Sequence, residues 1–570
     1  MEAGSTHKLK GVLKTIMPTL TIDEKQITVD PGTTVIQAAE KLGIEIPRYC
    51  YHPGLSIVGQ CRICLVEIEK MPKLQVACYT PAGDNMVVHT HSEKALRGRK
   101  DVLELLLVNH PLDCPVCDQA GECWLQEYYM RLGKYDSKMV EDKVKKEKAL
   151  DIGPHVMLDQ ERCILCSRCV RFCDEVSKSN ELGIFNRGDH SELAPYPGKR
   201  LDNLYSVNTV DICPVGALTE KDFRFEARVW YLDATDSICP GCSTGCNIQV
   251  HTNTERKHHA EGRRVVRLKP RYNAEVNQWW MCDVGRYVFK SVDDPSRMTT
   301  PMMKNGDEWI ATTWEVALEA AAAKIKKAPE RVGLIASPQM TNEDLFVLKR
   351  FADHLGIQNL AGTVTPKEKP LHDNFLLKAD RNPNTRGATL LGFGDDGVAA
   401  FKLLREARAQ KLNVVVIFHH DLSAGFDQEF VASVLQNVPT VIFIGTNQNA
   451  TSAMAHILLP AASWAEKDGT FTNFAERVQM IRKAVAPLGD ALPEWMIVKR
   501  LGRELGVPAP YLETQDVFAS IAREIPTFKG LTYELIGEHG FKLGDDPQAV
   551  AQARKLNKVP DQLRIIPIFD

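Results

Sequence analysis

All sixteen cysteines of this chain lie between Cys50 and Cys282, although the chain is 570 residues long. Most are two to five residues from a neighbour, so one loop presents several thiolates to a single metal centre. Fifteen cysteines and one histidine form four groups, which are Cys50/Cys61/Cys64/Cys78, His110/Cys114/Cys117/Cys123, Cys163/Cys166/Cys169/Cys213 and Cys239/Cys242/Cys246/Cys282. Only Cys173 is left over. The pattern predicts a row of iron–sulfur clusters and hence an electron conduit.

The composition is ordinary for a globular protein of several domains. The chain is too long for one hydrophobic core, and we expect about three to five domains. Its 44% hydrophobic and 25% charged residues are typical of such domains. The 70 basic residues balance 73 acidic ones, so no large electrostatic field favours nucleic acid as a partner.

Two further features bear on location. No apolar run approaches the ~20 residues of a membrane-spanning helix. Residues 1–20 have neither the apolar core nor the twin arginine of an export signal. We therefore expect a cytoplasmic protein with no membrane span. In a reducing compartment so many cysteines favour metal binding over disulfides.

Residues 1–90 are predicted to form a β-grasp ferredoxin with a [2Fe-2S] cluster. Residues 19–29 alternate as a strand, residues 30–32 are a turn (Asp-Pro-Gly), and residues 34–44 have helical periodicity. The sequence CLVEIE, starting at Cys64, reads as another strand. The first group has one close cysteine pair and two distant cysteines. Zinc ligands usually come as two close pairs, so we favour [2Fe-2S], with zinc as the alternative.

Residues 91–130 are predicted to form a helical module with a [4Fe-4S] cluster. A helix that opens at Ser92 runs into HPLDCPVCDQAGEC, which gives H-x3-C-x2-C-x5-C. His110 is the simplest fourth ligand. The alternative is a helix-end histidine beside three thiolates whose fourth partner lies elsewhere, for which only Cys173 is free. An imidazole in place of a thiolate makes a cluster less negative and raises its potential.

Residues 131–230 are predicted to hold a bacterial-type ferredoxin with a [4Fe-4S] cluster. The charge-dense stretch 131–150 comes first and is expected to be a solvated helix or linker without a chemical role. The motif C-x2-C-x2-C-x3-C then follows, and the domain ends at Cys213-Pro214.

A second cluster in this ferredoxin region is predicted to be lost. Its motif would need cysteines at positions that hold Asn203, Ser206 and Thr209. The surviving cluster would use the third group of ligands, and Cys173 would be a buried free thiol. Ligation by Cys173 in place of Cys213 stays open as the alternative.

Residues 231–290 carry C-x2-C-x3-C-x35-C, the fourth group. Three cysteines close together and a remote fourth suit a [4Fe-4S] cluster, although zinc competes for this spacing. The three preceding motifs favour iron and sulfur. Trp279 and Trp280 are expected to pack around the site.

From about residue 296 the sequence alternates between strands and helices. Residues 331–337, 413–418 and 440–445 are apolar runs flanked by helical segments, which predicts a parallel sheet covered on both faces. No G-x-G-x-x-G or P-loop motif opens a helix, so no nucleotide site is expected. A tight loop explains the glycine-rich residues 392–397. Residues 486–570 are expected to be a helical appendage that packs on a partner or a neighbouring domain.

The order of the four motifs resembles the large, G-type iron–sulfur subunit (75 kDa-like) of bacterial NADH:quinone oxidoreductase, respiratory complex I. The resemblance covers about residues 18–500 and includes HILLPAASWAEKDGTFTNFAERVQ and ALPEWMIVKRLGRELG. It implies a multidomain α+β and α/β protein. Residues 231–290 would be a molybdopterin-oxidoreductase-type [4Fe-4S] domain, and residues 291–485 an inactive, shortened molybdopterin-oxidoreductase-like α/β domain.

The resemblance also implies a role. The subunit would relay electrons from the NADH/flavin module towards quinone, coupled in the whole complex to proton translocation. It would hold one [2Fe-2S] and three [4Fe-4S] clusters, of which the fourth is an off-path relic, and no NADH or quinone site of its own. Its partners would be the flavin-bearing NADH-oxidising subunit and its [2Fe-2S] partner, and the two-cluster ferredoxin-like and quinone-site hydrophilic subunits. The complex would lie on the cytoplasmic face of the bacterial inner membrane, with this subunit in the peripheral arm.

Three other functions compete with this one. The catalytic subunit of an NAD-linked molybdenum formate dehydrogenase has the same N-terminal iron–sulfur domains. In such enzymes a thiolate or selenolate of the protein usually binds the molybdenum as well. No cysteine follows Cys282, and Val284 replaces the lysine that often links cluster and pterin, so no molybdenum is expected. An iron-only hydrogenase also needs further downstream cysteines. A zinc-stabilised scaffold leaves H-x3-C-x2-C-x5-C beside a ferredoxin motif unexplained.

Overall fold

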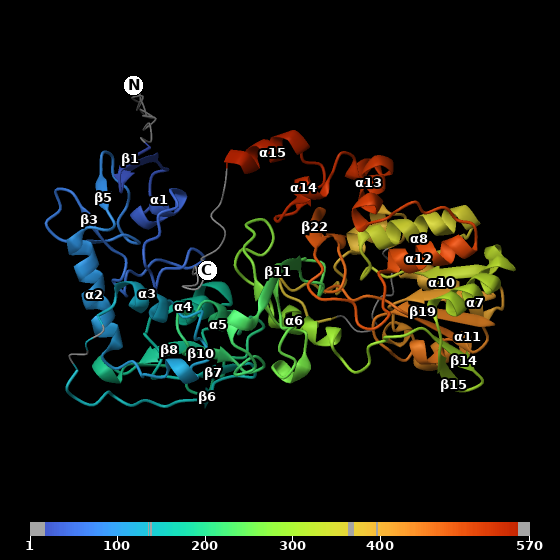
Figure 1. The fold of residues 1–570 in the computed structure, drawn as a ribbon, viewed down its shortest axis with the longest axis horizontal. Coiled ribbons are helices and arrows are strands. Elements are labelled where there is room, and N and C mark those ends of the chain that lie inside the picture. Colours follow the sequence, from blue (N-terminus) through green and yellow to red (C-terminus); the bar gives the residue numbers. More distant parts are fainter. Residues whose placement is uncertain (1–16, 135, 137–138, 363–369, 395–396, 557–570) are drawn as a thin grey trace, which may run out of the picture. The chain divides into compact units, whose positions relative to one another are not determined.

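The computed structural model describes residues 17–134, 136, 139–362, 370–394 and 397–556. The chain divides into two compact units, the first ending at Arg224 and the second beginning at Phe225 (Figure 1). The first unit therefore holds the first three ligand groups, and the second holds the fourth. Most of the N-terminal segment on which the absence of an export signal was judged lies outside the described residues.

The first unit opens with a five-stranded mixed sheet and one helix. The strand order is β2-β1-β5-β3-β4, with β1 and β5 parallel and the other pairs antiparallel. The elements are β1 (Thr19–Ile22), β2 (Lys25–Thr28), α1 (Val35–Lys41), β3 (Leu65–Ile68), β4 (Gln75–Val76) and β5 (Val87–His89). This is the β-grasp order, so the fold predicted for this region is confirmed.

The single strand predicted over residues 19–29 is a hairpin instead. Asp23 and Glu24 have φ of 45° and 69°, and the chain reverses there between β1 and β2. Two successive residues with positive φ make the tight turn that suits the twist of a hairpin. The apolar alternation continues on both sides of the turn, which is why the sequence reads as one strand.

The helix predicted over residues 34–44 is α1, and both of its ends are capped. Thr34 is the N-cap, and its amide donates to Gln37 Oε1 at 2.9 Å. At the other end Gly43 has φ of 70°, and its amide and the next one donate to carbonyls of the last turn. Glycine adopts this left-handed closure without the steric cost of a Cβ.

Two helices follow, α2 (Glu93–Leu107) and α3 (Trp124–Leu132). Ser92 caps α2 as predicted, because its side chain accepts a hydrogen bond from the Ala95 amide.

The described part of residues 131–150 is a linker with a structural role. Lys143 Nζ donates to the carbonyls of Leu107 and Val108, at 2.8 and 2.7 Å. These carbonyls lie at the C-terminal end of α2, where a cation also complements the helix dipole. The linker is therefore attached to the helical module, although its charge density predicts a fully solvated segment.

The ferredoxin region combines short strands with short helices. One sheet has the order β10-β7-β6, and β8 and β9 form a separate hairpin. The elements are β6 (Leu150–Asp151), β7 (Val156–Leu158), α4 (Arg168–Arg171), a π-helical turn (Phe172–Val176), β8 (Leu182–Phe185), β9 (Glu192–Pro195), α5 (Asn208–Asp211) and β10 (Leu218–Glu220). Of the third ligand group, Cys163 and Cys166 precede α4, Cys169 lies in its first turn, and Cys213 follows α5.

The second unit begins with an antiparallel sheet and a short helix that carry the fourth ligand group. These are β11 (Asp233–Ile238), β12 (Asn247–Thr252), β13 (Val265–Pro270) and α6 (Asp283–Arg286).

A seven-stranded sheet forms the centre of the second unit. Its order is β15-β14-β20-β19-β18-β16-β17; the five strands from β20 to β17 run parallel, and β14 and β15 are antiparallel at one edge. The strands are β14 (Met302–Asn305), β15 (Glu308–Ala311), β16 (Val332–Ile335), β17 (Asn359–Ala361), β18 (Val414–Phe418), β19 (Thr440–Gly445) and β20 (Ile457–Pro460). The apolar runs therefore form the predicted parallel sheet.

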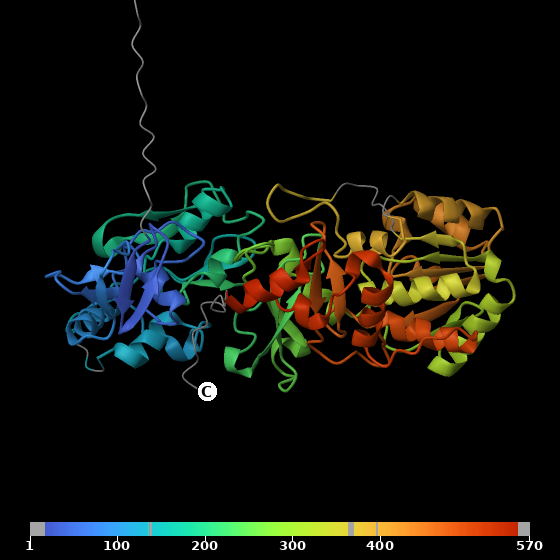
Figure 2. The same cartoon turned by 90° about the horizontal axis from the view of Figure 1, so that it is seen from above.

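Helices cover both faces of this sheet (Figure 2). In β18, Val414 and Val416 face one core, which α7 (Trp314–Lys326) and α8 (Asn342–Leu355) complete. Val415 and Ile417 face the other core, which α10 (Val398–Arg408) and α11 (Gln428–Leu435) complete. Successive side chains of a strand point to opposite faces, so two helical layers require a strand that is apolar throughout.

The C-terminal segment joins the same core rather than a separate one. Trp495, Ile497 and Val498 pack with residues of α7 and α8. The remaining elements are α9 (Thr385–Leu390), β21 (Gly469–Thr472), β22 (Arg477–Ile481), α12 (Glu494–Glu504), α13 (Thr514–Glu524), α14 (Tyr533–Ile536), β23 (Phe541–Lys542) and α15 (Pro547–Leu556). The strand β23 pairs with β22, so this segment is part of the α/β unit.

A buried ion network ties α8 to α12. Lys467 Nζ lies 2.8 Å from Asp344 Oδ2 and 2.5 Å from Glu494 Oε2, and His419 Nε2 lies 2.6 Å from Glu494 Oε1. The side chains of Lys467, Asp344 and Glu494 are at most 3% exposed. Lys467 holds the pKa of Glu494 down at about 2 against the effect of burial. One lysine therefore compensates two buried carboxylates.

Replacing Lys467 by methionine should destabilise the second unit by about 3–5 kcal/mol, because it leaves buried charge uncompensated. Hydrogen–deuterium exchange should become faster across α8 and α12. The control is Lys349→Met, which removes a partly exposed i,i+4 partner of Asp353 and should cost less than about 0.5 kcal/mol. Equal effects of the two substitutions would contradict the role of the buried network.

Candidate metal centres

The first ligand group lies in the loops around the β-grasp core. Cys50, Cys64 and Cys78 are at most 1% exposed. Cys50 shares thiol hydrogen bonds with Cys61 and Cys78, and Cys78 also with Cys64, so the four sulfurs form one group. These contacts lower the pKa of Cys50 and raise that of Cys78. The structure therefore brings the predicted first group together.

The second group lines a small cavity. Its lining includes the four predicted ligands, His110, Cys114, Cys117 and Cys123. Burial lowers the pKa of His110 to about 4, with help from the cation of Arg162, so the imidazole is neutral at pH 7 and able to bind a metal.

A glycine from another part of the first unit makes room at this second site. Gly216 also lines the cavity, and a Cβ there would lie 2.4 Å from Cys117 Sγ. Only glycine fits beside the ligand.

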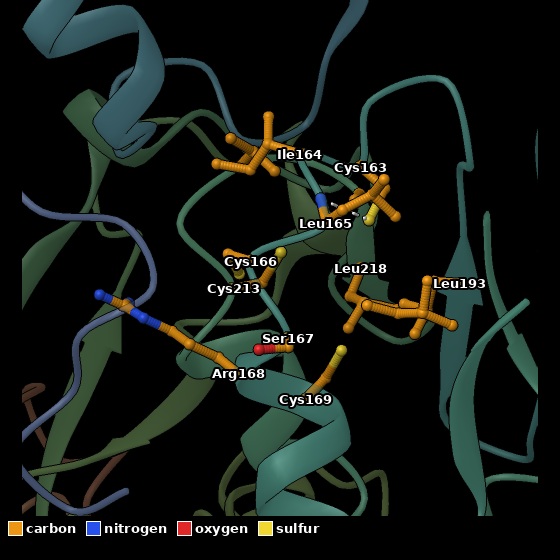
Figure 3. A pocket seen from close by; sticks show the side chains of 13 residues that line it. Cys163, Ile164, Leu165, Cys166, Ser167, Arg168, Cys169, Leu193, Cys213 and Leu218 are labelled. Atoms are coloured by element: carbon orange, nitrogen blue, oxygen red, sulfur yellow. Dashed lines mark hydrogen bonds between the residues drawn. The ribbon is translucent and has the colours of Figure 1, made fainter. Parts of the chain in front are cut away.

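The third group lines a second small cavity. Figure 3 shows the side chains of Cys163, Cys166, Cys169 and Cys213 around this space, with Leu193 and Leu218 on one wall. Burial raises the pKa of Cys163 to about 12 and that of Cys166 to about 11. Free thiols there would be protonated, so binding a metal would displace their protons.

Cys173 lies outside the lining of this cavity. Its side chain is fully buried, and burial raises the pKa of its thiol to about 12. Its contacts go to Ser179 and Glu181 instead. The geometry supports the predicted set with Cys213, and Cys173 as a buried thiol.

The fourth group is buried in the second unit. It comes from the loop between β11 and β12 and from the N-cap of α6, and its members, each 5% exposed, are Cys239, Cys242, Cys246 and Cys282. The amides of Gly241 and Gly285 donate to Cys239 Sγ and Cys282 Sγ, at 3.5 and 3.2 Å. A Cβ on Gly285 would meet both of these sulfurs, at 3.0 and 3.3 Å. Val284, at the position where active molybdenum enzymes often have a lysine that links cluster and pterin, is 38% exposed.

Cys239 and Cys242 differ in one respect from what their predicted role as cluster ligands requires. Their thiols donate to the carbonyls of Gly285 and Leu376, at 3.8 and 3.9 Å. A ligand to a cluster is a thiolate, which has no proton to donate, so cluster binding would have to replace these hydrogen bonds. Cys242 nevertheless belongs to the group. Burial raises the pKa of Cys239 and Cys282, and Cys242 lies close enough that a thiolate there would raise both further.

The predicted packing role of the neighbouring tryptophans agrees with the structure. Trp280 is 1% exposed, and the Trp279 ring lies 4.4 Å from that of Tyr272.

Within the described ranges, no three His, Cys, Asp or Glu side chains converge as ligands of a single metal ion would. An iron–sulfur cluster needs a different arrangement, because its four ligands surround several iron and sulfide atoms and therefore lie farther apart than the ligands of one ion. The second and third groups surround cavities, and backbone amides point at ligand sulfurs in the third and fourth. These donor sets fit iron–sulfur clusters.

Backbone strain accompanies the cysteine loops. Arg62, Leu165 and Ser167 have φ of 60°, 53° and 61°, which is the left-handed region that residues with a Cβ avoid. The Leu165 amide donates to Cys163 Sγ at 3.4 Å. The loops thus place amides beside sulfur at a conformational cost. No sequence signal marks these three residues, because none of them is glycine or asparagine.

Buried arginines beside the ligand groups were also missed by the sequence analysis. Arg99 and Arg168 are at most 2% exposed, and Arg171 is 7% exposed. The available signal was the sequence SRCVR, in which two arginines flank a cysteine of the tight motif.

The glycine-rich loop predicted at 392–397 is only partly described. Gly392 and Gly397 have φ of 90° and 69°, as a tight loop requires, and Asp395 and Asp396 lie outside the described residues. None of the described helices is long and apolar enough to cross a lipid bilayer.

Family comparisons agree with this order of sites. The matched models are the 2Fe-2S iron-sulfur cluster binding domain (17–93), the NADH-ubiquinone oxidoreductase-G iron-sulfur binding region (99–138), the NADH-quinone oxidoreductase subunit 3 ferredoxin-like domain (153–219), the Molybdopterin oxidoreductase Fe4S4 domain (232–294) and Molybdopterin oxidoreductase (297–385 and 379–504).

Curated relatives match almost the whole chain. The G subunit of NADH-quinone oxidoreductase from Rickettsia bellii is 30% identical over 90% of this chain and 90% of its own length. The chain belongs to this family of NADH-quinone oxidoreductase G subunits. The mitochondrial NADH-ubiquinone oxidoreductase 78 kDa subunit of Candida albicans is 31% identical over 86% of this chain and 83% of its own length. A chain of a solved NAD+-reducing [NiFe]-hydrogenase matches 37% of this chain and 91% of its own length, at 34% identity and a TM-score of 0.34.

The family assignment confirms the resemblance and the fold class predicted from the sequence. It also confirms iron–sulfur binding domains of both the [2Fe-2S] and the [4Fe-4S] type. The residue-level ligand sets remain predictions supported by the geometry.

Substitution of Cys213 and of Cys173 should separate the two sets of ligands for the third site. Cys213→Ala should lower the iron content by about four atoms per chain, because one [4Fe-4S] cluster is lost. Cys173→Ala should retain it, because this thiol lies outside the cavity. Elemental analysis of the anaerobically purified chain measures both. Iron loss in Cys173→Ala with full iron in Cys213→Ala would establish the alternative.

Proposed function

We propose that this chain is the electron-conducting iron–sulfur subunit of NADH:quinone oxidoreductase, which relays electrons from the NADH/flavin module towards quinone. The observation that supports it most is the set of four separate thiolate-rich sites, in the order in which the family's domain models match the chain. It holds one [2Fe-2S] cluster on the first group and a [4Fe-4S] cluster on each of the other three.

Bound iron–sulfur clusters accept and release single electrons. The protein binds, positions and shields them. Buried cysteines hold them, and the amides of Leu165, Gly241 and Gly285 donate hydrogen bonds to ligand sulfurs, which favours the reduced state. No residue of this chain makes or breaks a covalent bond of a substrate.

The same proposal includes the finer assignments. The domains are 1–90, 91–130, 131–230, 231–290 and 291–485, the last an inactive molybdopterin-oxidoreductase-like domain. Residues 486–570 follow as an appendage, whose described part packs on the core of that domain. The partners are the flavin-bearing subunit with its [2Fe-2S] partner on one side and the two-cluster ferredoxin-like and quinone-site subunits on the other. The subunit lies in the peripheral arm on the cytoplasmic face of a bacterial inner membrane.

A molybdenum formate dehydrogenase subunit is the second candidate function, because the molybdopterin oxidoreductase family model matches residues 297–385 and 379–504. The curated relatives over most of the chain carry the names of respiratory subunits instead. The chain also lacks a cysteine after Cys282.

Metal content and electron transfer of the purified complex test the proposal. We expect about fourteen irons per chain and no molybdenum, because one [2Fe-2S] and three [4Fe-4S] clusters are bound. Cys117→Ser should abolish most NADH-driven quinone reduction, while NADH oxidation by an artificial acceptor at the flavin module continues. Stoichiometric molybdenum would establish the formate dehydrogenase function instead, and normal quinone reduction in Cys117→Ser would refute the conduit.

His110→Cys tests the histidine ligand. A thiolate in place of a neutral imidazole adds negative charge, so the second-site cluster should stay bound and its reduction potential should fall. A redox titration followed by electron paramagnetic resonance (EPR) measures this change. The control His190→Cys changes an exposed histidine and should leave every potential as it was. An unchanged potential in His110→Cys would rule His110 out as a ligand.

A further inference from the structure

Arg168 is a buried cation without a carboxylate partner. It is 2% exposed, and among the described residues it forms no ion pair. Its Nε also lacks a hydrogen-bond partner there. Guanidinium groups stay charged in proteins, so burial without an anion is costly. Some other negative charge should therefore be close when the protein is complete.

The contacts of Arg168 reach residues next to all three ligand groups of the first unit. Nη2 donates to the Tyr51 carbonyl at 2.5 Å, and Nη1 donates to the Ile212 carbonyl at 3.0 Å. The guanidinium carbon lies 4.7 Å from the centre of the Trp124 ring. Tyr51 follows Cys50, Ile212 precedes Cys213 and Trp124 follows Cys123.

The acidic groups near Arg168 are thiols and one phenol. They belong to Cys166, Cys61, Cys213 and Tyr128. Figure 3 shows the Arg168 guanidinium directed away from the cysteines that line the third cavity. The side chain leaves the third site and reaches the backbone beside the first one. Its charge therefore lies between two ligand groups rather than within one.

Arg171 repeats this arrangement one turn later. Its Nη2 donates to the carbonyls of Cys50 and Cys166, at 2.6 and 3.4 Å, and it is 7% exposed. Arg48 provides the contrast, because that arginine pairs with Glu40. The two arginines of the SRCVR motif thus both connect the first and third ligand groups and have no carboxylate among the described residues to neutralise them.

We propose that Arg168 is a shared positioning residue that raises the reduction potentials of the clusters at the first and third sites together. An added electron makes a thiolate-ligated cluster more negative, and a fixed cation nearby stabilises that state. Water is excluded around Arg168, so its field is weakly screened. The inference rests on the proposed function in that it requires the clusters, and it holds whether or not the electrons continue to quinone.

Three variants of the full-length, cluster-loaded chain test this inference. Arg168→Gln removes the charge, and Arg168→Lys keeps it while losing the fork of donors. Arg187→Gln is the matched control, because it makes the same change at an exposed position of the same unit. Redox titrations followed by EPR give the potentials, and iron content and thermal unfolding report on loading and folding. The fourth site, in the other unit, is an internal reference.

We expect Arg168→Gln to shift the ratio of oxidised to reduced cluster at least tenfold at both sites, which is about 59 mV for a one-electron couple. Arg168→Lys should stay closer to the native potentials, and Arg187→Gln should match them. Unchanged potentials in Arg168→Gln would overturn the inference. Equal shifts in Arg168→Gln and Arg168→Lys would also overturn it, because the geometry of the fork rather than the charge would then be responsible.

Loss of clusters has a defined meaning as well. If Arg168→Gln does not bind its clusters, its potentials cannot be measured. The same redox titration is then made on Arg171→Gln and Arg171→Lys. If neither glutamine variant binds clusters while both lysine variants do, the clusters require a positive charge between the first and third ligand groups, and the inference is supported. Empty lysine variants would overturn it. Shifted potentials in a complex that does not reduce quinone would refute the proposed function alone.

Discussion

Bonding between buried sulfur and a metal cluster is the interaction on which the first unit depends. The segment between α1 and β3 contains no helix or strand, yet it includes Cys50, Cys61 and Cys64. Two of these cysteines are almost fully buried, and Arg62 between the ligands has left-handed backbone. Loops with few backbone hydrogen bonds and strained residues need another source of stability. Ligation of a cluster by these cysteines would supply it, because metal binding and folding are coupled.

The same dependence explains the distribution of charge around the sites. Arg168 and Arg171 lack carboxylate partners among the described residues although they are buried, whereas Arg48 has one. Fixed cations beside thiolates are what a negative cluster needs for compensation. A π-helical turn directly follows α4, the helix that contains Cys169 of the third group. Such turns are rare, and they occur frequently at functional sites.

The second unit depends on different physics. A parallel sheet with helices on both faces buries apolar strands throughout, and Lys467 joins α8 to α12 through two carboxylates. Apolar side chains on both faces of the sheet and buried ion pairs hold this scaffold together. Its N-terminal part, around Cys239 and Cys282, carries the fourth ligand group. A fold of this kind does not by itself specify a reaction, since folds and functions change independently.

The sequence alone predicted the four ligand groups, and it determined the β-grasp and parallel-sheet regions and the N-cap of α2. Ligand spacing, apolar periodicity and capping residues are local properties, which one stretch of chain encodes. The tertiary structure decided the hairpin at Asp23, the capping of α2 by Lys143 and the position of Cys173 outside its neighbours' cavity. It also decided the placement of Arg168 between ligand groups. These features depend on residues far apart in the chain or on backbone angles, and no local pattern reports either.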